Sequence, residues 1–199
     1  MPNTRDIRNR IKGVKSTRQI TRAMQMVATS KMKKAQDAAK TGRPYALILA
    51  DIIVSIADEF EEITQSYFVQ KPIKHRGILV IGTDKGLCGA LNGNLFRKLS
   101  DVENSAKFIS VGKRATQFLG RTKRDLLADF SLPDKPTFSD IRKIVDFLLR
   151  SYDDGSIDTI EILYTSFVNT LSQEPELIRL MPLNDLDSMT QKLLSLIHI

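Results

Sequence analysis

Cysteine, histidine and tryptophan are nearly absent from this sequence of 199 residues, which has one cysteine, two histidines and no tryptophan. A single cysteine excludes an internal disulfide, and so few thiol and imidazole groups predict no metal centre. No run approaches the roughly 18–20 apolar residues needed to cross a bilayer, so we expect no membrane insertion. The sequence opens without an apolar signal core or a serine-rich transit segment, which favours a bacterial protein on the cytoplasmic side.

Acidic residues are scarce in the first 43 positions, which hold 12 Lys/Arg residues against two acids, Asp6 and Asp37. The remaining positions carry 18 bases and 21 acids, so all of the positive excess lies at one end. A concentrated positive segment predicts a negatively charged partner.

Apolar residues recur at alternating steps of four and three from Ile7 to Phe60, filling twelve of sixteen positions. A repeat sustained over about eight heptads predicts one long coiled-coil helix over residues 1–60. Three of the polar exceptions cluster at Arg18, Thr21 and Gln25. Proline at position 44 predicts a kink or short break near residues 42–44.

Basic residues are also periodic, since Arg8, Lys15 and Arg22 recur every seven positions beside the apolar seam. Three partners fit such a helix. A nucleic acid suits a basic region followed by a zipper, although the bases here flank the seam throughout. A membrane surface favours bulky aromatics opposite the charge, which residues 1–44 lack. The third is an acidic protein collar, and composition alone leaves the choice open.

Residues 76–183 follow a linker (61–75) and alternate between strand and helix patterns. This predicts an α/β domain with an open, mostly parallel, Rossmann-like sheet. We expect strands at 77–82, 107–111, 125–130, 159–167 and 175–181, and helices at 90–99, 112–119 and 139–151. Ser139 is the expected N-cap of the last helix.

Glycines at 82, 86 and 89 follow the first strand, in a loose relative of the dinucleotide fingerprint. The second strand is followed by Gly112-Lys113-Arg114 instead of an acid, which at best suits the 2′-phosphate of NADP. The sequence has no GxxxxGK[ST] phosphate loop. We therefore expect no cofactor, with an NADP-binding protein as a remaining alternative.

Catalytic groupings are also missing. Neither His75 nor His198 can be placed beside a nucleophile or a carboxylate. Cys88 lies in the glycine-rich turn near Lys85, and a lone cysteine without a base is more often a small turn residue than a nucleophile. We expect no enzyme activity on this chain.

Two segments resemble a known family. Residues 20–32, ITRAMQMVATSKM, resemble the N-terminal helix of the gamma subunit of F-type ATP synthases. Residues 83–92, TDKGLCGALN, resemble that family's glycine-rich turn, with Lys85 where arginine is common and Ala90 where glycine is common. The resemblance covers residue 1 to about residue 182, and the motifs occur in the family's order.

The resemblance implies a non-catalytic central stalk, or rotor. In that family the N- and C-terminal helices coil together inside a ring of alpha and beta subunits, and the α/β domain meets the epsilon subunit and the membrane c-ring. Proton flow turns the c-ring and the stalk, which forces the catalytic sites on the beta subunits through their conformations. The chain would then transmit torque as a peripheral protein of the bacterial plasma membrane.

The resemblance also assigns contact with the alpha/beta ring to four helix residues and four turn residues. These are Arg8, Lys15, Arg22 and Met24, and Asp84, Lys85, Gly86 and Cys88. The family's C-terminal helix only begins at residues 184–199, so we expect a truncated copy whose last residues (about 194–199) are not native. The α/β domain should then fold, whereas the long helix should fray or self-associate.

Overall fold

The computed structural model describes residues 3–59, 67, 72–169 and 171–183. The chain forms two compact units, residues 1–49 and 50–199. The predicted linker falls largely, and the predicted start of a C-terminal helix wholly, outside the described residues. No described helix is long and apolar enough to cross a membrane. Within the same residues, no group of three or more His, Cys, Asp or Glu side chains could hold a metal ion.

Helix α1 (Thr4–Glu59) is a single helix of 56 residues. At 1.5 Å per residue its length along the axis is about 84 Å. Pro44 lies inside it, and the helix is unbroken through residues 42–44. The prediction of a short break is therefore wrong. Proline deprives only one backbone carbonyl of its donor, and on an exposed helix that carbonyl can bond to water. The predicted kink stays a prediction.

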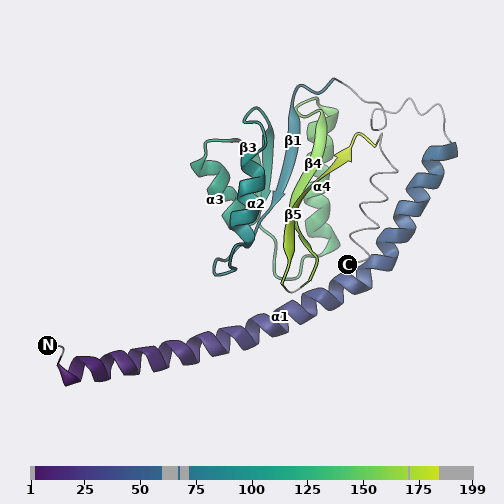
Figure 1. Cartoon of the computed structure of the whole chain (residues 1–199). Coiled ribbons are helices and arrows are strands. Elements are labelled where there is room, and N and C mark those ends of the chain that lie inside the picture. The colour runs from purple at the N-terminus through teal and green to yellow at the C-terminus, as the bar shows by residue number, and fades with distance from the viewer. Residues whose placement is uncertain (1–2, 60–66, 68–71, 170, 184–199) are drawn as a thin grey trace. The chain divides into compact units, whose positions relative to one another are not determined.

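The α/β domain is built on a five-stranded sheet in the order β3-β2-β1-β4-β5 (Figure 1). Its strands are β1 (Arg76–Ile81), β2 (Lys107–Val111), β3 (Asp125–Phe130), β4 (Thr159–Phe167) and β5 (Gln173–Met181). The first four are parallel, and β5 pairs with β4 in the antiparallel sense at one edge. The predicted open, mostly parallel sheet is confirmed.

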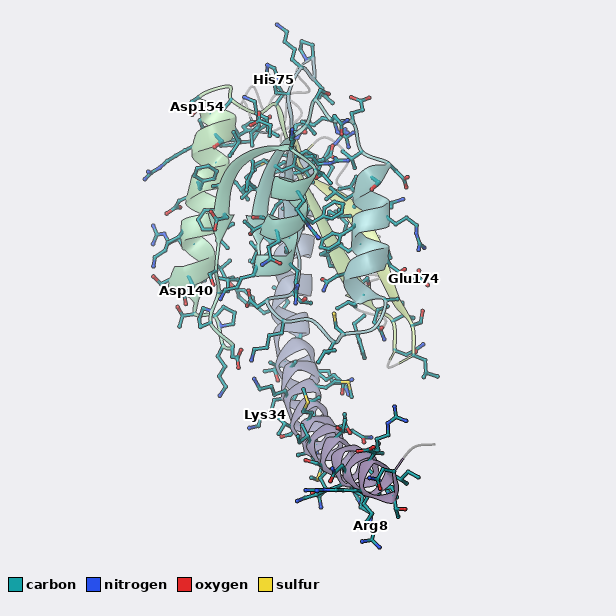
Figure 2. The ribbon with its side chains drawn as sticks, turned by 90° about the vertical axis from the view of Figure 1, so that its left-hand side faces the viewer. Arg8, Lys34, His75, Asp140, Asp154 and Glu174 are labelled. Atoms are coloured by element: carbon teal, nitrogen blue, oxygen red, sulfur yellow. The ribbon has the colours of Figure 1, made fainter. Side chains whose placement is uncertain are left out.

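Helices cover both faces of this sheet. Helix α2 (Leu91–Ser100) packs over β4 and β5, and α3 (Lys113–Arg121) packs over β2 and β3. Both contribute to one apolar core with Ile78, Val80 and Phe108. Helix α4 (Phe138–Asp153) packs against the opposite face, where Figure 2 marks its two ends by Asp140 and Asp154.

The N-cap of α4 is Thr137, so the prediction of Ser139 is wrong. The Thr137 hydroxyl accepts a hydrogen bond from the backbone N–H of Asp140, and the Asp140 carboxylate accepts one from the backbone N–H of Thr137. This reciprocal capping box needs an acceptor side chain three residues after the cap, which Thr137 has and Ser139 does not. The apolar side of α4 is also only partly buried: Ile144 and Leu148 are in the core, whereas Phe138 is 82% exposed.

A buried carboxylate lies near the amino ends of the parallel strands. Glu161 on β4 is 2% exposed. It pairs with Arg76 of β1 on one side and, at 3.3 Å, with Arg179 of β5 on the other. Two partly exposed guanidinium groups therefore neutralise it, and this ion-paired row ties three adjacent strands together.

Candidate functional site

Three basic residues of α1 form a row along one side of the helix. Arg8, Lys15 and Arg22 are all exposed and recur every seven residues, a spacing that shifts position by only about 20° around a straight helix. No ion pair within the described part of the chain involves any of the three. Their charges are therefore available to another molecule.

The apolar seam of α1 is exposed as well. Ile7, Ile11 and Val14 expose 46%, 51% and 69% of their surface, and Met24, which lies outside the seam repeat, exposes 50%. Side chains of this size gain about 1.5–3 kcal/mol each from full burial, so a partner that covers the seam would stabilise the helix considerably. The polar interruption at Thr21 is satisfied internally, since its hydroxyl donates to the Thr17 carbonyl at 2.8 Å.

The turn that follows β1, residues 82–90, is held by a side-chain network. The Asn92 side chain donates to the Thr83 hydroxyl at 2.7 Å and to the Cys88 sulfur at 3.2 Å. The Thr83 hydroxyl in turn donates to the Lys85 carbonyl at 2.7 Å. Cys88 is a free thiol of intermediate exposure whose sulfur accepts a hydrogen bond from Asn92.

Asp84 joins this turn to the start of α3. Its carboxylate accepts a hydrogen bond from the backbone N–H of Lys113 at 3.1 Å, and the next N–H, of Arg114, donates to the Thr83 carbonyl at 2.9 Å. A carboxylate at a helix N-terminus is stabilised by the free N–H groups and by the helix dipole. Asp84 is therefore an anchor of the turn, whereas Lys85 projects into solvent.

Gly86 and Leu87 form the tip of the turn. A Cβ atom at Gly86 would lie 2.8 Å from the Arg114 guanidinium, so the glycine makes room for that group. Leu87 has a φ of 62° and is 94% exposed. A leucine in the left-handed region costs roughly 1–2 kcal/mol. Such strain persists where the surrounding structure imposes it, as the network around Thr83 and Asn92 does here.

The NADP alternative does not fit this geometry. Close packing explains Gly82 and Gly112, because a Cβ at Gly112 would collide with the carbonyl oxygen of Gly82, and a Cβ at Gly82 would lie 3.0 Å from that of Ala115 in α3. The place where a 2′-phosphate would be sought, at Lys113, already holds the Asp84 carboxylate. Two anions at one helix terminus would repel each other.

The structure thus brings together the four predicted turn residues, and it places the four predicted helix residues along α1. The roles of Asn92, Gly112 and Leu87 were not predicted. The sequence could have indicated two of these residues, because Asn92 belongs to the motif at 83–92 and Gly112 directly follows a predicted strand. Leu87 carried no such signal, because left-handed backbone geometry is not expected of leucine.

Comparison with known proteins identifies the family. The protein-family model described as ATP synthase matches residues 3–196. The ATP synthase gamma chain of Desulfitobacterium hafniense is 35% identical over 188 residues, covering 92% of this chain and 67% of the relative. The chain belongs to the ATP synthase gamma-chain family. The gamma chain of Opitutus terrae is 46% identical over 193 residues, which cover 97% of this chain and 66% of that one.

Solved structures agree on the fold of this family member. A central stalk and c-ring structure of the Tetrahymena thermophila mitochondrial ATP synthase matches with a TM-score of 0.63 at 21% identity, covering 89% of this chain and 87% of the other. A Euglena gracilis mitochondrial ATP synthase structure matches with a TM-score of 0.56 at 19% identity, covering 93% and 59%. The predicted membership of the gamma-chain family is confirmed. The chain spans about two thirds of the length of the bacterial relatives.

Proposed function

We propose that the chain is the central-stalk (rotor) subunit of an F-type ATP synthase, which transmits torque between the membrane c-ring and the alpha/beta ring. The observation that supports this most directly is α1, a 56-residue helix with an exposed apolar seam and an exposed row of cations. Such a helix needs partners that cover its seam and neutralise its charge. A stalk inside an acid-lined ring provides both.

The chain itself is proposed to be non-catalytic. The glycine-rich turn is filled by its own contacts, with Asp84 on the α3 terminus and the Arg114 side chain beside Gly86. The membrane c-ring and the epsilon subunit are the further partners that we propose. The proposed location is the cytoplasmic side of a bacterial plasma membrane, reached through the c-ring and without insertion of this chain.

Charge reversal of Lys15→Glu together with Arg22→Glu tests the proposal. One exposed ion pair contributes about 0–1 kcal/mol, so both substitutions should weaken binding to a purified alpha/beta ring by about 1–2 kcal/mol, roughly five- to thirtyfold. Binding is measured by surface plasmon resonance at several salt concentrations, because screening should reduce the difference between the two proteins.

The matched control reverses Arg97 and Lys98 on α2, which changes the net charge equally at two other exposed positions. This control should bind like the unmodified chain. Equal losses in both double variants would show that only net charge matters and would contradict a role for the α1 row.

A nucleic-acid-binding protein remains the alternative, favoured only by the same row of cations. It would bind DNA or RNA with an affinity that falls steeply with salt. Binding of the unmodified chain to nucleic acid but not to the ring would refute the stalk proposal.

A further inference from the structure

The segment between α1 and β1 is fastened to the α/β domain at two points. Of this segment, residues 67 and 72–75 are described. Near its end, the Asp158 carboxylate accepts hydrogen bonds from the backbone N–H groups of Lys74 and His75, at 2.9 and 2.8 Å, and the His75 carbonyl accepts one from the N–H of Asp158. The other point lies earlier, at Tyr67. Positions that the sequence predicts as a linker are therefore bonded to the domain.

Tyr67 is held by its side chain. Its hydroxyl donates a hydrogen bond at 3.1 Å to the carboxylate of Asp153, the last residue of α4. Its ring lies 6.0 Å from the ring of Tyr152, which is 3% exposed and belongs to the core on the α4 face. The ring of Tyr67 thus packs against that core, and its hydroxyl fixes the direction in which the side chain lies.

The backbone of Tyr67 holds a second segment. Its carbonyl accepts a hydrogen bond at 2.8 Å from the N–H of Leu183, two residues after the end of β5. Leu183 also lines an apolar groove of about 230 Å³ together with Leu149 of α4 and Leu180 of β5. The chain that enters the domain before β1 and the chain that leaves it after β5 therefore meet at one residue.

This meeting point lies at one end of α4. Figure 2 labels Asp154, which follows α4, and His75 at the same end of the domain. Seven positions (60–66) separate α1 from Tyr67, whereas fourteen (60–73) separate it from Lys74. At about 3.3–3.6 Å per residue, the anchor at Tyr67 reduces the longest reach of the connection from roughly 50 Å to roughly 25 Å. A shorter connection limits how far the domain can turn before the helix must follow.

We propose that Tyr67 is a positioning residue of the stalk, the point at which the α/β domain passes torque to the segments before β1 and after β5. The inference rests on the proposed stalk function. When the domain turns, force between α4 and either segment passes through the Tyr67 ring and its bond to Asp153. Without this side chain, the first described anchor of the entering segment would be Asp158, and the N–H of Leu183 would lose a fixed acceptor.

Amide hydrogen exchange of the whole chain, followed by mass spectrometry, tests the anchor. Tyr67→Ala removes the ring contact and the bond to Asp153, so the N–H of Leu183 should exchange about tenfold faster. Tyr67→Phe keeps the ring and should give a smaller increase. The N–H of His75, which is bonded to Asp158, should exchange at the same rate in all three proteins. Unchanged exchange at Leu183 in Tyr67→Ala would overturn the inference.

The torque role is measured in the assembled ATP synthase, in membrane vesicles, as the number of ions pumped per ATP hydrolysed. Tyr67→Ala should lower this ratio and leave the rate of ATP hydrolysis unchanged, because slippage at the anchor separates hydrolysis from pumping. Ile78→Val is the control for stability. Ile78 is fully buried in the core on the other face of the sheet, so its truncation weakens the domain without touching the anchor and should leave the ratio unchanged.

The outcomes separate this inference from the proposed function. An unchanged ratio in Tyr67→Ala, or an equal loss in Ile78→Val, overturns the torque role of Tyr67 while the stalk proposal stands. If the unmodified chain supports no coupled pumping, the stalk proposal fails and this inference fails with it. Faster exchange at Leu183 together with a lower ratio, both confined to the Tyr67 variants, supports both.

Discussion

Replacing Gly112 by alanine should destabilise the α/β domain strongly. Gly112 has a φ of 93° and a ψ of 137°, a region that residues with a Cβ rarely enter, at a cost of about 1–3 kcal/mol. The new Cβ would also collide with the carbonyl of Gly82, whose carbon lies 3.0 Å away. Both partners in this contact are backbone, so the two loops must separate.

Separation of the loops would strain several backbone hydrogen bonds. Gly82 donates to Val111 at 2.9 Å, Gly112 donates to Phe130 at 3.1 Å, and Arg114 donates to Thr83 at 2.9 Å. Each such bond contributes roughly 0.5–1.5 kcal/mol net. Together with the backbone strain, we expect a loss of about 3–5 kcal/mol, a large share of the 5–15 kcal/mol that stabilises an ordinary domain.

Urea unfolding followed by tyrosine fluorescence measures this loss, because the sequence has no tryptophan, and Tyr152 and Tyr164 both lie in the α/β domain. Gly120→Ala is the matched control. A Cβ at Gly120, inside α3, would meet nothing within 4 Å, so alanine there should stabilise by about 0.5–1 kcal/mol. Equal unfolding midpoints for the two variants would refute the steric argument.

Two further predictions concern α4 and β4. Thr137→Ala removes the N-cap of α4 and should lower the free energy of unfolding, measured by urea titration, by about 1 kcal/mol. Ser139→Ala is the control and should change this free energy little. A larger loss for Ser139→Ala than for Thr137→Ala would contradict the capping box with Asp140. Burial raises the pKa of Tyr164 above its ordinary value of 10.0, and the negative charge of Glu176 and a hydrogen bond to it add to this effect. Since the folded state then keeps a proton that the unfolded state releases, the contribution of Tyr164 to stability should be constant below about pH 10 and fall above it. Tyr164→Phe should flatten that fall in alkaline urea titrations, and an unchanged profile would show that Tyr164 does not cause it.

The sheet could be predicted from the sequence because most strands are short apolar runs that end at a turn signal; β5, which has several polar residues, was predicted two residues short at its start. The β2, β3 and β4 ranges were predicted to the residue, and the β1 range to within one position at each end. Parallel pairing followed from the alternation with helices. The cap of α4 was predicted wrongly although the sequence carried a signal, because Thr137 has the acceptor Asp140 three residues later and Ser139 has none.

Some features of the candidate site could likewise be predicted from the sequence, and others could not. The period of Arg8, Lys15 and Arg22 is a property of the sequence alone, since seven residues make nearly two whole turns of any helix. The left-handed geometry of Leu87 depends on the hydrogen bonds by which Thr83 and Asn92 hold the turn. A left-handed leucine leaves no local pattern in the sequence, so only the folded structure shows it.

The two units should differ in resistance to trypsin. The side chains of α1 that the structure describes are exposed, apart from the intermediate Gln36, so little packing beyond the helix's own hydrogen bonds is available to stabilise it. Isolated helices are marginally stable, because most helical stability in proteins comes from tertiary packing. Limited proteolysis should therefore cleave first after the bases between Arg5 and Lys40 and leave the α/β domain intact. Adding the alpha/beta ring should protect those sites, because the ring covers the seam on which the proposed function depends. Equal resistance of α1 and the domain, without the ring, would show that the seam is already covered and that its exposure cannot indicate a missing partner.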